Sequence, residues 1–176
     1  MKRFLLTVAA VLASVLAFAQ SLEGTWTGKD KMDDSSEGAD VSATATVSYT
    51  LKGESYSTKM LLVMDLSAEK EGEKVTMKIT ITGSHAGTWN RQGDILTFTP
   101  DKKAKPKIDV KVEGIPSFLA SMLVAPAKRE VSKALKETER YKVVSLTDKE
   151  LVLEDILTEK EIKAGEKADR ITLTKK

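Results

Sequence analysis

The sequence contains no cysteine, which excludes a disulfide framework, a lipid-modified cysteine anchor and a cysteine nucleophile. Histidine is almost as scarce, because His85 is the only one. A zinc site needs several convergent histidine, cysteine or carboxylate ligands, and the residues beside His85 offer no obvious second ligand. We therefore expect His85 to be a solvent-exposed histidine in a turn that binds no metal.

Catalytic motifs are missing as well. The chain has no Gly-x-Ser-x-Gly elbow, and nothing in the sequence positions a serine against His85. Two carboxylates could meet for glycoside hydrolysis, but 26 acidic residues make a chance pair almost certain. The acidic residues around Gly38 do not follow the order of a calcium-binding loop. We expect no enzymatic activity, no cofactor and no metal.

The N-terminus has the pattern of a secretory leader. Lys2 and Arg3 precede an apolar run over residues 4–16, and Ala17-Phe18-Ala19 supplies the small residues that signal peptidase requires. The run is shorter than the ~20 apolar residues that span a bilayer. The pattern predicts a signal peptide over residues 1–19 and export to the periplasm or beyond, without a lipid anchor or a transmembrane span after cleavage.

The mature chain, residues 20–176, is predicted to form a single domain. Removing Lys2 and Arg3 from the 28 basic residues leaves 26, which equals the 26 acidic residues. A basic field that would hold nucleic acid by counterion release is therefore absent. We expect no nucleic-acid partner.

Alternation of apolar and polar residues dominates the mature chain and is typical of half-buried β-strands. It is clearest from Val41 to Lys52. Strands are predicted over residues 22–30, 41–52, 56–66, 75–82, 95–99, 108–112, 141–146, 151–156 and 170–174. Loops or bends are predicted over residues 30–40, 83–87, 100–106 and 160–167. The hairpin series favours an all-β fold, an antiparallel up-and-down barrel of about 8–10 strands or a sandwich. An outer-membrane barrel is disfavoured, because its apolar side chains would face outward.

The spacing of the apolar residues changes after Gly114 from strand alternation to a helical period, which predicts a helical insertion at about 116–138. Pro116 suits the first turn of a helix. An apolar stripe at helical spacing follows, formed by Phe118, Leu119, Met122 and Leu123. Proline is disfavoured inside a helix, so we expect a second helix to begin at Pro126. Its predicted inward residues are Ala127, Val131, Ala134 and Leu135.

Three stretches of the chain resemble known protein families. Gly24-Thr25-Trp26, early in the first strand, resembles the Gly-x-Trp signature of lipocalins. Residues 87–98 and 141–153 are similar to the lipocalin-like (calycin-type) secreted proteins of Bacteroides-type bacteria. The resemblance implies that Trp26 closes the barrel floor and that Arg170 stacks over its indole as a structural pair. The chain departs from the family in lacking a disulfide and in placing a helical insertion within the strand series.

The predicted inward face supplies a candidate ligand site, because a barrel of about eight strands holds either its own side chains or one small ligand. Small and flexible apolar side chains are the candidate cavity lining: Ala43, Ala45, Val47, Met60, Leu62, Met64, Met77 and Ile79. The first hypothesis is an exported lipocalin-like barrel that binds a small, largely apolar molecule in its interior. The stripe Phe118, Leu119, Met122 and Leu123 would then form a lid.

The second hypothesis is a barrel with a filled core. It would act as a protein–protein interaction module in the periplasm or envelope through the 116–138 insertion, whose apolar stripe would be the partner surface. Two further arrangements have the same stripe as a membrane-surface patch or packed against the barrel flank. The sequence leaves these alternatives open.

Overall fold

The computed structural model describes residues 22–36, 39–70, 73–157, 162–163, 165 and 167–176. Its strands are β1 (Gly24–Ser36), β2 (Ala39–Lys52), β3 (Ser55–Lys70), β4 (Glu73–Gln92), β5 (Ile95–Pro100), β6 (Lys107–Glu113), β7 (Glu139–Leu146), β8 (Glu150–Asp155) and β9 (Arg170–Lys175). One helix, α2 (Ser117–Ala134), lies between β6 and β7. The predicted signal peptide lies outside the described residues.

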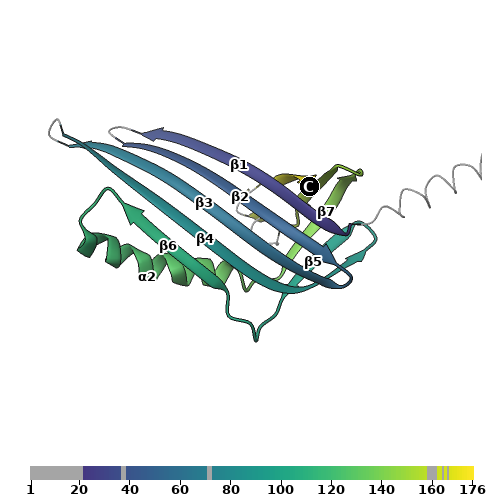
Figure 1. Cartoon of the computed structure of the whole chain (residues 1–176). Coiled ribbons are helices and arrows are strands. Elements are labelled where there is room, and N and C mark those ends of the chain that lie inside the picture. Colours follow the sequence, from purple (N-terminus) through teal and green to yellow (C-terminus); the bar gives the residue numbers. More distant parts are fainter. Residues whose placement is uncertain (1–21, 37–38, 71–72, 158–161, 164, 166) are drawn as a thin grey trace, which may run out of the picture.

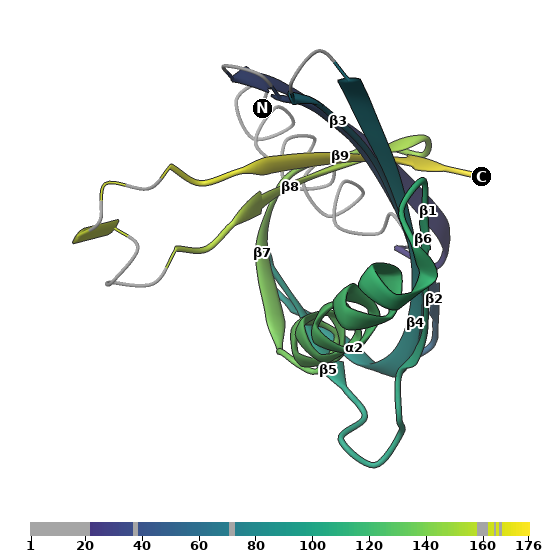
Figure 2. The ribbon, with the colours of Figure 1, turned by 90° about the vertical axis from the view of Figure 1, so that its left-hand side faces the viewer.

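Eight strands close into an antiparallel barrel, which Figure 2 shows end-on. They follow the order β3-β2-β1-β9-β8-β7-β5-β4, and pairing of β3 with β4 completes the ring. β4 carries two partners along its other edge, since Gly87–Gln92 pair with β5 and Lys78–Ser84 pair with β6. The predicted antiparallel barrel with a helical insertion is therefore confirmed.

Four strands are much longer than the ring requires. β1 to β4 contain 13, 14, 16 and 20 residues, whereas β5 to β9 contain six to eight. β1 pairs with β9 only over Trp26–Gly28, although it continues along β2 to Ser36. The far parts of β1 to β4 project beyond the ring as a curved open sheet (Figure 1). We call the projecting part of these strands, residues 29–36, 39–47, 60–70 and 73–83, the trough.

Two predicted loops are parts of strands. Residues 30–36 continue β1 because each of them pairs with a residue of β2, so their polar composition does not end the strand. Residues 83–87 continue β4, where the glycines allow neighbouring strands and side chains to approach closely. A Cβ atom on Gly87 would collide with the carbonyl oxygen of Thr99. These glycines therefore serve packing within the strand and make no bend.

The end of the ring near the N-terminus of β1 is filled with side chains. Trp26 and Leu96 have no exposed surface, and Phe98 is 1% exposed. The ring of Phe98 stacks on Tyr49 with centroids 4.8 Å apart, and it meets the rings of Tyr56 and Tyr141 edge-on. This part of the barrel interior is a packed core.

The basic partner of Trp26 is Lys175, and the predicted pair of Trp26 with Arg170 is wrong. Lys175 Nζ lies 5.1 Å from the centroid of the indole ring, because the register of β9 against β1 pairs these two residues. Arg170 lies at the other end of β9, where its Nε is 2.6 Å from Oε2 of Glu154. Trp26 has no exposed surface, and its indole N–H donates a 2.7 Å hydrogen bond to the carbonyl of Leu22.

The helical insertion is one helix, and the predicted break at Pro126 is wrong. Pro126 lies inside α2 on an exposed side, where water can bind the backbone carbonyl that loses its intrahelical donor. The partly buried apolar residues of the helix share one stripe: Ala120, Val124, Ala127, Val131 and, just beyond its end, Leu135. Ala134, also predicted to face inward, is exposed. The helix packs beside β6 (Figure 1).

Candidate ligand-binding site

Strand register builds the inner face of the trough. Pairing of β2 with β3 aligns apolar residues two by two: Val47 with Met60, Ala45 with Leu62, and Ala43 with Met64. β4 extends these rows with Gly83, Ile81 and Ile79, and the next row contains Val41, Leu66 and Met77. Residues in register point to the same face of a sheet. The structure therefore brings all eight predicted cavity-lining residues onto one face.

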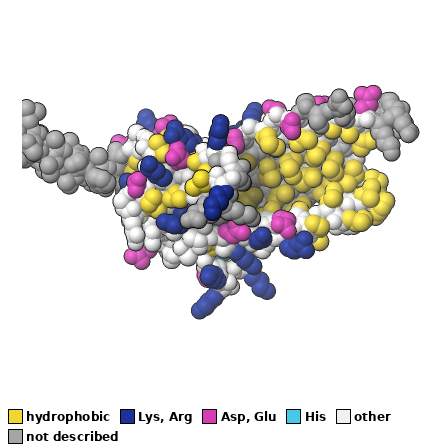
Figure 3. Space-filling view, turned by 180° about the vertical axis from the view of Figure 1, so that it is seen from behind, with side chains coloured by type: hydrophobic (Ala, Val, Ile, Leu, Met, Phe, Trp, Pro, Cys, Tyr) yellow, Lys and Arg dark blue, Asp and Glu magenta, His cyan; other side chains and the backbone are white. Residues whose placement is uncertain are grey.

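This inner face is partly open to solvent. Ala43 is buried and Ala45 is exposed, whereas the other six predicted lining residues are half-buried. Figure 3 shows a continuous apolar area here, beyond the ring. β6 extends it at one edge, where Val110 pairs with Ile81 and Val112 with Ile79. Large contiguous apolar patches are rare on monomeric proteins and mark sites of binding.

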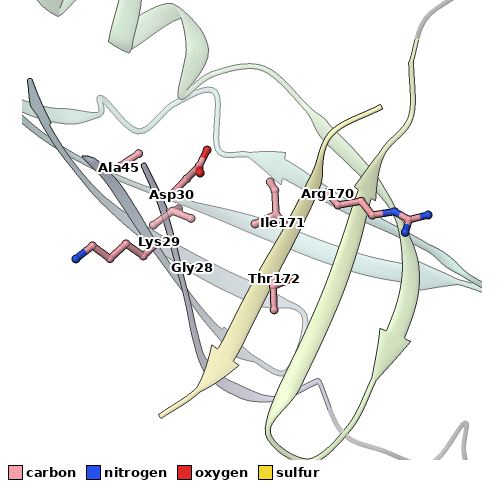
Figure 4. A pocket seen from close by; sticks show the side chains of 8 residues that line it. Gly28, Lys29, Asp30, Ala45, Arg170, Ile171 and Thr172 are labelled. Atoms are coloured by element: carbon pink, nitrogen blue, oxygen red, sulfur yellow. The ribbon is translucent and has the colours of Figure 1, made fainter. Parts of the chain in front are cut away.

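A pocket of about 400 Å³ opens where β1 separates from β9. Its lining comes from three strands: Gly28, Lys29, Asp30, Ala45, Val47, Arg170, Ile171 and Thr172. In Figure 4, Asp30, Ala45 and Ile171 point to one side of the sheet, and Lys29 and Thr172 point to the other. The pocket therefore extends the apolar face sideways to the seam of the barrel and adds one carboxylate to it.

A row of buried polar side chains separates the trough from the packed core. Tyr49 pairs with Thr58, and Thr58 pairs with His85. These residues are only 6%, 8% and 6% exposed, respectively. The expectation of a solvated turn histidine is wrong, because His85 belongs to β4. Its position could have been found by continuing the alternation of Ile79 and Ile81 through the glycines.

Hydrogen bonds connect this row to β7. The hydroxyl of Tyr49 donates to Oε2 of Glu139 at 3.0 Å, and that of Tyr141 donates to the same oxygen at 3.4 Å. Burial raises the pKa of Glu139, although the two hydrogen bonds act in the opposite direction. Burial, assisted by the charge of Glu139, also raises the pKa of Tyr56 to about 12 and that of Tyr49 further. The phenols therefore remain hydrogen-bond donors at neutral pH.

The apolar stripe predicted on the insertion is exposed to solvent. Phe118 and Met122 are 65% and 68% exposed and lie on the side of α2 opposite its partly buried stripe, while Leu119 and Leu123 are also exposed. Basic residues continue this side of the helix: Arg129, Lys133 and, just beyond its end, Lys136. We call the side that carries Phe118, Met122 and these three basic residues the outer ridge. Packing against the flank is therefore excluded for Phe118 and Met122.

Among the residues that the structure describes, no three histidine, aspartate or glutamate side chains gather where they could hold a metal ion. Over the same residues, no helix has the length and apolar content needed to cross a membrane.

Comparison with known proteins leaves the fold and the site as the basis for function. No protein-family model matches the chain, and no curated protein is significantly similar to it. What the structure defines is a closed β-barrel with a filled floor and a projecting, partly exposed apolar face.

Proposed function

We propose that this protein is an exported, lipocalin-like carrier that binds a largely apolar molecule on the inner face of the trough. The proposal depends on one observation, the set of in-register apolar rows that β2, β3 and β4 carry beyond the filled core. Covering such a face contributes roughly 25 cal/mol per Å² of apolar surface removed from water. The leader pattern of residues 1–19 supports a periplasmic or extracellular site of action.

The trough supports ligand binding better than the interior of the ring does. The interior near Trp26 is occupied by aromatic and leucine side chains, so a ligand there would have to displace core atoms. In the trough, the half-buried methionines Met60, Met64 and Met77 are flexible and can adapt to a guest. The proposed ligand therefore lies along the projecting strands.

Filling the trough tests this proposal. Ala45 is exposed on the inner face beside Leu62, so the indole of Ala45→Trp would occupy the trough without displacing buried atoms. Thr46→Trp is the matched control, because adjacent residues of a strand point to opposite faces. Titration of the mature protein with a fluorescent apolar probe should show binding weakened about tenfold or more by Ala45→Trp and unchanged by Thr46→Trp. Equal affinities for the two folded variants would contradict the proposal.

Native mass spectrometry of protein purified gently from its own host addresses the ligand itself. A stoichiometric extra mass that solvent extraction removes would identify it. The Ala45→Trp variant should carry less of this mass than the Thr46→Trp variant does.

A second candidate function, interaction with an envelope protein, is favoured by the outer ridge of α2. This ridge exposes Phe118 and Met122 and continues with Arg129, Lys133 and Lys136. The segment from Asp101 to Lys136 contains nine basic and four acidic residues, in a mature chain that is neutral overall. The ridge therefore fits an acidic partner with apolar contacts.

Site-specific photo-crosslinking in the native host tests this second function. A crosslinker at position 122 should capture a defined partner, and one at Thr82, on the outer face of β4, should not. Charge reversal at Lys133 should reduce the capture without changing binding of the apolar probe. Equal capture from both positions would contradict a specific partner surface.

A further inference from the structure

His85 has a buried hydrogen-bond donor that no other described residue satisfies. Its Nδ1 accepts a 2.8 Å hydrogen bond from the backbone N–H of Ala86. A neutral imidazole has one acceptor and one donor nitrogen, so the proton lies on Nε2. Within the part of the chain that the structure describes, Nε2 is buried and has no hydrogen-bond partner. Such a group destabilises a protein unless something supplies an acceptor.

The position of His85 suggests what that acceptor is. His85 lies in the polar row with Thr58 and Tyr49, and the adjoining row, the first of the trough, contains Val47, Met60 and Gly83. On the inner face of β4, His85 is therefore the first polar side chain reached from the apolar rows. A ligand lying along the trough would end at this row.

Movable side chains crowd the trough row that adjoins His85. The neighbouring inward position on β4 is Gly83, which has no side chain. A Cβ atom there would lie 2.8 Å from Cγ of Met60 and 3.1 Å from Cδ1 of Leu135. Methionine is unbranched and adopts many rotamers, and Leu135 lies just past the end of α2. Rotation of these two side chains would open the way from the trough to the imidazole.

We propose that the Nε2–H group of His85, with Thr58 beside it, binds a hydrogen-bond-accepting oxygen at one end of the ligand. The ligand is therefore an amphiphile, an apolar chain that ends in a hydroxyl or a carboxyl group. Its polar end lies at the inner end of the trough, and its chain follows Met60, Leu62 and Met64 toward the hairpin tips. This inference depends on the proposed carrier function and adds the chemistry and the orientation of the ligand.

Because His85 is the only histidine, nitrogen-15 labelling of histidine reports on this one imidazole. Addition of hexadecanol or palmitic acid to the mature protein should shift the Nε2 resonance in nuclear magnetic resonance spectra. Hexadecane has the same chain without an oxygen and should bind without moving this resonance to the same position. A shift of equal size and direction with hexadecane would overturn the inference.

Two variants test the same hydrogen bond through affinity. His85→Phe removes the donor and should weaken binding of hexadecanol or palmitic acid about tenfold, with little effect on hexadecane. His85→Gln keeps an N–H donor and should retain most of the affinity. If His85→Phe does not fold, the measurement on the unaltered protein still decides the matter.

The possible failures can be told apart. If both amphiphiles bind but neither moves the His85 resonance, the proposed hydrogen bond from His85 (the anchor) is overturned and the carrier function stands. If neither the amphiphiles nor the fluorescent apolar probe bind, the carrier function is overturned and the anchor with it.

Discussion

The hydroxyl of Tyr49 donates a 3.0 Å hydrogen bond to Glu139 and joins two strands that are not neighbours in the barrel. Tyr49 lies near the C-terminal end of β2, one of the long strands, and Glu139 is the first residue of β7, one of the short strands. The bond therefore crosses the interior between the trough and the core. It places a carboxyl group where burial raises its pKa.

The stability of the protein should therefore depend on the ionisation of Glu139. The folded protein holds this proton to a higher pH than the unfolded chain does, because its folded pKa is raised. The resulting contribution to stability is fully present below about pH 4.3, the ordinary pKa of glutamate, and is lost as pH rises through the raised value. Glu139→Gln stays neutral and can still accept the bond from Tyr49. Urea denaturation should show the variant gaining stability relative to the wild type as pH rises from 4 to 8.

The exposed Glu150 provides the control for this pH series, since Glu150→Gln removes the same charge at the start of β8. Its free energy of unfolding should stay nearly parallel to that of the wild type. A constant difference between Glu139→Gln and the wild type across the pH range would contradict the assignment of a raised pKa to Glu139.

Lys175, and not Arg170, should be energetically coupled to Trp26. A cation over an indole contributes about 0.5–1 kcal/mol at partly exposed sites. In double-mutant cycles with Trp26→Leu, Lys175→Met should show a coupling energy of about this size. Arg170→Met should be additive with Trp26→Leu, because its ion pair is with Glu154. Coupling of Trp26 to Arg170 but not to Lys175 would instead support the pair of Trp26 with Arg170 that the resemblance implied.

Gly87 should tolerate a methyl group far less well than Gly53 does. A Cβ atom on Gly87 would collide with backbone atoms of β5, which cannot rotate away, so Gly87→Ala should cost about 3 kcal/mol. Gly53 has open space around it and a φ of +54°, so Gly53→Ala should cost only the backbone term of about 1 kcal/mol. Urea denaturation of both variants checks the order, and a smaller loss for Gly87→Ala would refute it.

Pro126 should lower the local stability of α2 and leave the stability of the barrel unchanged. Proline in a helix interior costs about 3 kcal/mol relative to alanine, and none of the described residues of α2 is fully buried. Pro126→Ala should slow hydrogen exchange of the amides in the second half of α2 about tenfold or more. Core amides such as that of Phe98 should exchange at an unchanged rate. Equal slowing in the helix and the core would show that the two unfold together.

The alternation of Val41 to Leu51 was sufficient to place Ala43, Ala45 and Val47 on one inner face, because side chains of a strand alternate strictly. The same rule applied to Met60, Leu62 and Met64. It failed where composition was used in its place. The polar composition of residues 30–40 predicts a loop and the glycines around His85 predict a bend, but both segments belong to strands.

The sequence by itself determined the all-β character of the protein, the inward phase of its long strands and the place of the helical insertion. These features depend on apolar periods of two and 3.6 residues, and such a period is visible within a single strand or helix of the sequence. Only the tertiary structure decided that Lys175 covers Trp26, that the ring is filled and that the apolar rows continue outside it. Those outcomes depend on the register between strands far apart in the chain, and register is set by pairing and packing across the barrel, which no local pattern contains.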